Sequence, residues 1–428
     1  MTPKKTILPN GLRIITVPIK DAPTVTILVT VEAGSKYETK NVNGLSHFLE
    51  HMCFKGTTKR PNAIDISREL DSIGAHYNAS TSQEFTGYYA KSHPKHISKL
   101  VDVISDMYLN PTFPAKEIEK EKGVIVQEIL MYEDMPQRHV FDVFLELMYG
   151  DQPAGWNIAG TPELVKSFSQ ENFLAYRREH YVASGTIVVV AGNFEEAALL
   201  SEIEKAFAGI SVAAKNAKFA VNEAPNGVPQ TAPAIKFLEK KTDQTHLVIG
   251  VRTFGAGDKR APALSVLNSV LGGGMSARLF QKLRDELGIC YYVRSGTDEY
   301  TDHGSLIISA GVDSDRIGEA TKAIIGEMKC MKDEIVSPEE LAKAKEQIIG
   351  GLYLGLESSD AIADFVSFQE VLRGKILTPE EYSEKIAAVS AEDVRTLAHE
   401  IFTPERLNIA LISKEADTAA LSEILATL

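Results

Sequence analysis

The sequence predicts an α+β protein of two homologous domains, each a mostly antiparallel sheet with helices packed on one face. The first observation is length, because 428 residues exceed what one ordinary hydrophobic core accommodates. The second is an internal repeat whose two copies are separated by about half of the chain. The third is that strand-like and helix-like runs are mixed along both halves. A repeat this long indicates a duplicated domain rather than a solenoid of short units.

The repeat is visible in two pairs of segments. Thr24–Gly34 matches Thr245–Gly255, and at the same spacing Asn172–Gly192 matches Asp393–Ser413. Between the copies, Ser211–Ala234 is poor in large apolar residues and rich in Ala, Asn and Pro, which is typical of a linker. We therefore predict an N-terminal domain over residues 1–212, a linker over 213–234 and a C-terminal domain over 235–428.

Turn signals and residue types place the elements of the first half. Pro9-Asn10-Gly11 lies between the β-rich runs Thr6–Leu8 and Leu12–Val17 and predicts a hairpin. Thr24–Ala33 is a predicted strand, and the Thr- and Tyr-rich segment Ala75–Ala90 predicts two more. The predicted helices and one further buried strand are Ala63–Ile73, His93–Leu109, Glu117–Asp134, Val140–Met148, Thr161–Phe168, Gln170–Tyr181, the strand Thr186–Ala191, and Glu195–Phe207.

Composition limits the classes of partner and location. A hydrophobic content of 44% and a charged content of 24% are typical of globular proteins. The net charge of −13 argues against nucleic acid as the main partner. The sequence holds no apolar run of about 18 residues, so no membrane span is expected. The first residues lack the apolar segment of a signal peptide, so the expected location is the cytoplasm.

The segment Gly44–Gly56 (GLSHFLEHMCFKG) contains His47, Glu50 and His51 in an H-x-x-E-H arrangement. On a helix, positions i and i+4 share a face, so the two imidazoles form a candidate pair of zinc ligands. Glu50 lies on nearly the same face and is suited to activate a metal-bound water. This order is that of the inverzincins. The alternative is an ordinary helix face on which these residues coincide by chance.

The three cysteines, Cys53, Cys290 and Cys330, are few, odd in number and widely spaced, so they predict no disulfide framework. Cys53 is a rival zinc ligand because it follows His51 by two residues. That spacing places it away from the face of the two histidines, and we interpret it as a packing residue.

Two further acidic residues lie on the predicted helix Glu117–Asp134. Glu128 lies well beyond the motif in sequence, and Glu121 lies two turns before Glu128 on the same face. The H-x-x-E-H motif, followed further along the chain by the E-x6-E pair Glu121 and Glu128, resembles the pitrilysin/insulinase family of zinc metallopeptidases. The resemblance is in particular to the mitochondrial-processing-peptidase-like half-size units of that family. The resemblance implies that Glu50 is the general base and that His47, His51 and Glu128 bind one zinc ion. It also implies that Glu121 supports the site by contacting a zinc ligand and not the zinc ion itself.

The resemblance assigns substrate contacts as well. In the family an edge strand beside the zinc pairs with the substrate backbone, and this chain has Asn78 and Ala79 at that place. Such strand addition binds the main chain of a peptide and depends little on most of its side chains. An Arg followed seven residues later by a Tyr, here Arg284 and Tyr291, is implied to hold the substrate and polarise its carbonyl. Tyr292 is the neighbouring alternative.

The second half of the repeat carries no zinc motif. When the two copies are aligned, His47 corresponds to Val266, Glu50 to Ser269 and His51 to Val270. We therefore expect one Zn²⁺ per chain, bound by the first domain.

The expected function is that of a metalloendopeptidase that cleaves peptides or unfolded protein segments inside a closed chamber. Since relatives enclose this chamber with four such domains, a chain of two domains is expected to form a homodimer, in which Arg284 and Tyr291 face the zinc of the other subunit. A heterodimer with a zinc-less sister chain is the other arrangement. The alternative functions are a non-catalytic assembly subunit of the same fold and a peptide-binding module.

Overall fold

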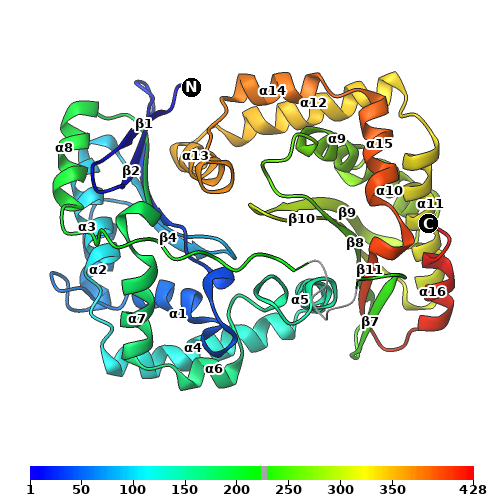
Figure 1. Ribbon diagram of the computed structural model, residues 1–428, viewed down its shortest axis with the longest axis horizontal. Coiled ribbons are helices and arrows are strands. Elements are labelled where there is room, and N and C mark those ends of the chain that lie inside the picture. The colour runs from blue at the N-terminus through cyan, green and yellow to red at the C-terminus, as the bar shows by residue number, and fades with distance from the viewer. Residues whose placement is uncertain (223–228) are drawn as a thin grey trace. The chain divides into compact units, whose positions relative to one another are not determined.

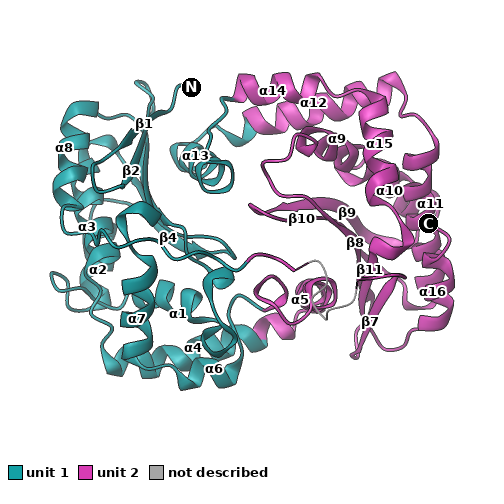
Figure 2. Ribbon diagram, viewed as in Figure 1, with its two compact units in different colours: residues 1–130, 157–219, 354–378 teal, residues 131–156, 220–353, 379–428 magenta. Residues whose placement is uncertain are grey.

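The computed structural model describes residues 1–222 and 229–428, which divide into two compact units (Figure 2). Unit 1 consists of residues 1–130, 157–219 and 354–378, and unit 2 of residues 131–156, 220–353 and 379–428. Residues 223–228 of the predicted linker lie outside the described residues. The described remainder of that linker contains no helix, and a strand begins only at its last residue, Ala234. The domain boundaries predicted from the sequence repeat therefore stay a prediction.

The sheet of unit 1 has six strands in the order β1-β2-β6-β3-β5-β4. All neighbours are antiparallel except β2 and β6. The hairpin predicted around Asn10-Gly11 is confirmed, because β1 pairs with β2 and Ile7 lies opposite Arg13. The strands are β1 (Lys4–Ile7), β2 (Arg13–Pro18), β3 (Val25–Val31), β4 (His76–Thr81), β5 (Thr86–Ser92) and β6 (Thr186–Gly192).

One face of this sheet is covered by helices from the first half of the chain. Phe48, Ile66 and Val101, from three different helices, are buried against apolar strand residues such as Ile27 and Val188. The helices are α1 (Leu45–Met52), α2 (Ala63–Asp71), α3 (Ile97–Leu109), α4 (Ala115–Glu133), α6 (Pro162–Ser167), α7 (Gln170–His180) and α8 (Glu196–Ala206) (Figure 1). The helix predicted from His93 begins at Ile97, after a 3₁₀ turn over Pro94–His96.

The opposite face is covered by α13 (Ser359–Arg373), which comes from the second half of the chain (Figure 2). Ile362, Ala363 and Val366 of this helix pack against Ile15 and Val189 of the sheet. The sequence predicts helices on one face of the sheet, and the helices from the same half of the chain do cover one face. The structure adds a single helix on the second face.

Unit 2 repeats the plan, with a five-stranded sheet in the order β7-β11-β8-β10-β9, in which only β7 and β11 are parallel. Its strands are β7 (Ala234–Glu239), β8 (Thr245–Thr253), β9 (Cys290–Glu299), β10 (Gly304–Val312) and β11 (Leu407–Ser413). Its helices are α5 (Pro136–Tyr149), α9 (Ala261–Gly272), α10 (Arg278–Phe280), the π-helical turn η6 (Gln281–Glu286), α11 (Ile317–Asp333), α12 (Pro338–Gly355), α14 (Pro379–Ala387), α15 (Ala391–Ile401) and α16 (Thr418–Leu425).

The repeat found in the sequence also relates the elements. α15 is the counterpart of α7 and has the same length, and β11 is likewise the counterpart of β6. α5 is the counterpart of α13, and it packs on the sheet of unit 2 through residues such as Phe144 and Met148. Each unit is thus completed by a helix from the other half of the chain. The α+β fold class predicted from the sequence is confirmed.

No helix among the described residues is long and apolar enough to cross a membrane.

Candidate metal centre

His47 and His51 lie on one side of the short helix α1, because the other side of the helix is buried in the hydrophobic core. Leu45, Phe48 and Met52 are buried in unit 1, which leaves the two histidines at the partly buried margin of the helix. Their rings lie edge to face with centroids 4.7 Å apart. The predicted sharing of one helix face by positions i and i+4 is observed.

The start of α1 is fixed by a buried carboxylate. Glu38 accepts hydrogen bonds from the backbone N–H groups of Gly44 (2.9 Å) and Ser46 (2.6 Å). These donors have no partner within the helix, and an anion is favourable at a helix N-terminus. Gly44 itself has φ +96° and lies so close to Ala159 O that a Cβ would stand 2.5 Å from it, so glycine is required there. Burial raises the pKa of Glu38 to about 7.

Glu128 of α4 completes a cluster of three possible metal ligands. Its Oε2 lies 3.7 Å from Nε2 of His47 and 3.7 Å from Nε2 of His51. The three ligand atoms all lie within 4.8 Å of one another. Atoms bound to zinc at about 2.0–2.1 Å in a tetrahedral arrangement lie about 3.4 Å apart, so small side-chain rotations bring this set to ligand spacing. Two imidazoles and one carboxylate are a donor set that suits Zn²⁺.

His47 and His51 differ in their surroundings. Burial, reinforced by the charge of His51, lowers the pKa of His47 to about 4, so its imidazole is neutral at pH 7 as a ligand must be. Its Nδ1 is buried without a hydrogen-bond partner among the described residues. Burial alone would lower the pKa of His51, but a hydrogen bond to Glu121 and the neighbouring carboxylates outweigh it and raise that pKa.

Glu121 lies behind the cluster, on the Nδ1 side of the His51 ring. Its Oε1 lies 2.9 Å from Nδ1 of His51, and its Oε2 lies 2.7 Å from Nζ of Lys55. Burial would raise the pKa of Glu121, but these two partners outweigh burial and lower it. Such a carboxylate fixes the tautomer and ring orientation of a metal-binding histidine. Sequence reasoning missed Lys55, although it follows His51 by four residues, one turn along the chain.

Glu50 lies on α1 between the two histidines in sequence, and it is buried. Its Oε2 accepts a hydrogen bond of 2.5 Å from the hydroxyl of Thr81, the last residue of β4. Burial raises the pKa of Glu50, the charge of Glu128 adds to this effect, and the Thr81 hydrogen bond opposes it. Sequence reasoning also missed Thr81. Its only signal was a position two residues after Ala79 on the same strand face.

Cys53 is fully buried, and its Sγ lies 3.5 Å from the hydroxyl of Tyr88. Within the described residues it is not part of the group of metal-ligating side chains. The structure thus places Cys53 in the core, as interpreted from its spacing.

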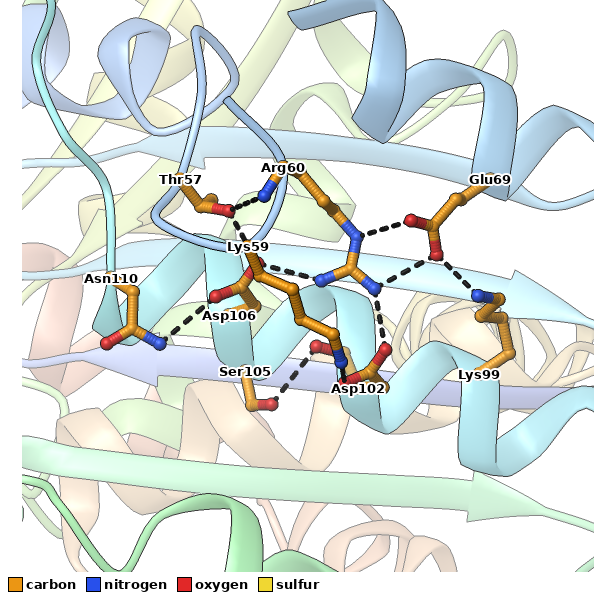
Figure 3. A network of polar contacts seen from close by, with 9 residues as sticks. All are labelled: Thr57, Lys59, Arg60, Glu69, Lys99, Asp102, Ser105, Asp106 and Asn110. Carbon is orange, nitrogen blue, oxygen red and sulfur yellow. Dashed lines mark hydrogen bonds and ion pairs between the residues drawn. The ribbon is translucent and has the colours of Figure 1, made fainter. Parts of the chain in front are cut away.

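The loop that follows α1 is held by a network of ion pairs around Arg60 (Figure 3). The guanidinium is 2% exposed and contacts Asp106 (2.7 Å), Asp102 (2.6 Å) and both carboxylate oxygens of Glu69 (3.0 and 2.9 Å). Thr57 joins the network by donating to Asp106. The loop between α1 and α2 is therefore anchored to α3.

Asn78 and Ala79 lie on β4, the last strand of the unit 1 sheet, and face Tyr89 and Tyr88 of β5. Along β4 exposed and half-buried side chains alternate, and Asn78 is exposed. The Asn78 side chain accepts a hydrogen bond of 2.9 Å from the backbone N–H of Ala79. Since β4 pairs with β5 alone among the described strands, its outer edge has backbone groups available for another strand.

Arg284 and Tyr291 lie together in unit 2. Arg284, on the turn η6, donates to the backbone oxygen of Tyr291, and its guanidinium lies 5.2 Å from the centre of the Tyr291 ring. Tyr291 is 73% exposed. By contrast, the hydroxyl of Tyr292 lies 3.0 Å from Nδ1 of His246. Of the two tyrosines, Tyr291 is the one available to a ligand.

Comparison with known proteins agrees with the fold and the motif. Residues 13–162 match the family described as insulinase (peptidase family M16), and residues 167–348 match the peptidase M16 inactive domain. The chain is 37% identical over 407 residues to an uncharacterized zinc protease of Bacillus subtilis, covering 94% of this chain and 96% of that protein. It is 32% identical to an uncharacterized zinc protease of Streptomyces coelicolor, covering 94% and 87%. The chain belongs to peptidase family M16, the insulinase family.

Solved structures show the same fold at lower sequence identity. The crystal structure of a protease from Helicobacter pylori has a TM-score of 0.90 at 20% identity, over 96% of this chain and 99% of that one. A structure described as the peptidase M16 inactive domain from Pseudomonas fluorescens has a TM-score of 0.88 at 16% identity, over 97% and 99%. These structures show the fold alone, and it is the family matches and the Bacillus subtilis relative that confirm the family resemblance.

Proposed function

We propose that this protein is a zinc-dependent endopeptidase that cleaves peptides or unfolded protein segments. The observation that carries the proposal is the convergence of His47, His51 and Glu128, with Glu50 on the same helix as the two histidines. Three protein ligands that leave a coordination position open are typical of catalytic rather than structural zinc sites. The relatives named zinc proteases support the choice of metal, and we propose one Zn²⁺ per chain.

In this proposal each residue of the centre has a separate task. His47, His51 and Glu128 hold the ion, and Glu121 orients His51. A bound zinc ion supplies Lewis-acid activation of a water molecule and of the peptide carbonyl. Glu50 accepts a proton from the attacking water and delivers it to the leaving amide nitrogen. A buried carboxylate on the same helix as the two histidines is suited to this double role, because one group both takes up and releases the proton.

We propose that the substrate adds as a strand to the free edge of β4, beside Asn78 and Ala79. This mode of binding recognises the main chain, so it requires an extended or unfolded segment. Arg284 and Tyr291 then hold the substrate and stabilise the developing charge on its carbonyl oxygen. The exposure of Tyr291 and its contact with Arg284 support this assignment.

We further propose that two copies form a homodimer that encloses the substrate in a chamber, with Arg284 and Tyr291 acting at the zinc of the other subunit. Mixing Glu50→Gln and Tyr291→Phe chains tests this. In mixed dimers one of the two sites keeps both residues, so roughly a quarter of the wild-type activity should return. If the residues act within one chain, or if a zinc-less sister chain is required, mixing should restore nothing.

The second candidate is a non-catalytic assembly subunit or peptide-binding module. The match of residues 167–348 to the inactive domain of the family favours it. The complete set of ligand residues in the first half favours the peptidase. Processing-peptidase activity and the predicted cytoplasmic location stay predictions.

The deciding experiment is cleavage of a mixture of unstructured peptides by the zinc-loaded wild type and Glu50→Gln, followed by mass spectrometry. Glu50→Gln keeps the metal ligands and removes the base. Cleavage by the wild type alone supports the peptidase. If both proteins bind zinc and neither cleaves, the peptide-binding module is favoured. Equal cleavage by both proteins contradicts the role of Glu50.

A further inference from the structure

We infer that Thr81 is the positioning residue of the proposed general base and ties it to the strand that receives the substrate. The inference rests on the proposed function and adds to it a residue outside the metal motif. It starts from the hydrogen bond of 2.5 Å between the Thr81 hydroxyl and Oε2 of Glu50. A hydrogen bond to an ionised carboxylate is short and about twice as strong as one between neutral groups.

The hydrogen bond distinguishes the two oxygens of Glu50. A threonine hydroxyl has one proton to donate, and Thr81 gives it to Oε2. Among the described residues no donor reaches Oε1. Oε2 thus already accepts one hydrogen bond, and Oε1 is the oxygen left without a protein donor to take a proton from water. Thr81 fixes both the rotation of the carboxylate and the atom at which the proton is held.

Thr81 is itself held by the sheet. It is paired with Thr86 of β5 at the end of the β4–β5 ladder, and the Thr86 hydroxyl lies 3.4 Å from Oγ1 of Thr81. Thr86 in turn donates to Ala33 O at 3.0 Å. A β-branched side chain has few χ1 rotamers, so a threonine on a strand is a rigid donor.

The position of Thr81 along β4 has a consequence for the substrate. Ala79 and Thr81 are two residues apart, so their side chains point to the same face of the sheet, towards α1. The strand proposed to bind the substrate backbone therefore also sets the orientation of the base. Reactive groups held in this way lose activity when displaced by about 1 Å, even if binding is unchanged.

The test compares three substitutions on one strand in the full-length, zinc-loaded protein. Thr81→Val keeps the shape and removes the donor, Thr81→Ser keeps the donor, and Ser80→Ala removes an exposed hydroxyl from the opposite face. We expect Thr81→Val to lower kcat by about 10- to 100-fold, the effect of one hydrogen bond to a charged group, with KM within about twofold. Thr81→Ser and Ser80→Ala should keep most of kcat, and all three should bind zinc with wild-type Kd in a chelator competition.

Crystal structures of Thr81→Val and Thr81→Ser give a readout that does not depend on turnover. The Glu50 carboxylate should rotate in Thr81→Val and stay in place in Thr81→Ser. An unmoved carboxylate in Thr81→Val, a wild-type kcat for Thr81→Val, or an equal loss in the Ser variant overturns the inference. A rise in KM at constant kcat also overturns it, because the hydroxyl would then serve substrate binding. Failure of the proposed function shows differently, as equal cleavage by the wild type and Glu50→Gln.

Discussion

At the scale of single residues, the metal centre depends on contacts outside the H-x-x-E-H motif. Glu121 lies between His51 and Lys55, and Thr81 contacts Glu50. In the proposed metal centre the motif supplies the reactive atoms, whereas these neighbours set the orientation in which the atoms are presented. None of these contacts is encoded by the spacing within the motif.

Replacing Glu121 by Gln should weaken zinc binding about 10- to 100-fold, because the hydrogen-bond partner of His51 loses its charge. Lys55→Met should weaken it less, since Lys55 acts only through Glu121. Competition with a chelator measures both constants. Lys59→Met is the matched control, as Lys59 is exposed on the same loop and pairs with Asp102. A wild-type zinc affinity in Glu121→Gln would show that the carboxylate does not support the ligand.

A second prediction concerns His180, which is buried at the end of α7 between the rings of Tyr37 and Tyr176. Burial lowers its pKa to about 4. Between pH 6.5 and 4 the unfolded chain therefore binds a proton that the folded chain excludes, and stability falls with acidification. The loss attributable to His180 is on the order of 3 kcal/mol across this range.

His180→Phe should remove this part of the acid sensitivity, so its free energy of unfolding should fall less than that of the wild type between pH 7 and pH 4. Urea unfolding at both pH values measures the difference. His399→Gln is the control, since His399 is exposed on α15. Identical pH dependence of the wild type and His180→Phe would contradict the prediction.

At the scale of elements, the Arg60 network holds the loop after α1 against α3 (Figure 3). A buried ion pair adds little net stability, but removing one partner leaves uncompensated charge. Arg60→Met leaves Asp106 buried and Asp102 and Glu69 without their main cation. We expect a loss of about 3–5 kcal/mol in the free energy of unfolding, measured with urea.

Arg68→Met, at an exposed position of α2, is the control for the Arg60 prediction and should change stability by less than about 0.5 kcal/mol. If both arginine variants unfold alike, the network contributes no more than an ordinary surface charge.

At the scale of the whole molecule, the two halves of the chain are not independent domains. α13 covers one face of the unit 1 sheet, although it lies in the second copy of the repeat. A fragment of residues 1–212 lacks this helix and exposes Ile15, Val17 and Val189 to water. We expect this fragment to aggregate or to melt at a lower temperature than the full chain, as followed by circular dichroism and light scattering. A fragment as stable as the full chain would show that the helix is dispensable.

Much of this organisation could be predicted from the sequence. The repeat, the α+β class and the hairpin at Asn10-Gly11 follow from local patterns, because turn chemistry and strand periodicity act over a few residues. His47, Glu50 and His51 are neighbours for the same reason, since a helix brings positions i and i+4 together regardless of the rest of the chain. The family resemblance added Glu121 and Glu128, which the structure then places beside the histidines.

Which distant side chains meet depends on the packing of the whole chain. The Thr81–Glu50 contact joins a strand to a helix 31 residues away, and the exchange of α5 and α13 packs a helix from each half of the chain on the sheet of the other half. Local propensity has no means of encoding such pairs, because they arise when apolar faces are buried against whichever surface fits them. Local sequence patterns thus identify the candidate reactive residues and the fold class. Packing determined how those residues are oriented and which helices complete each sheet.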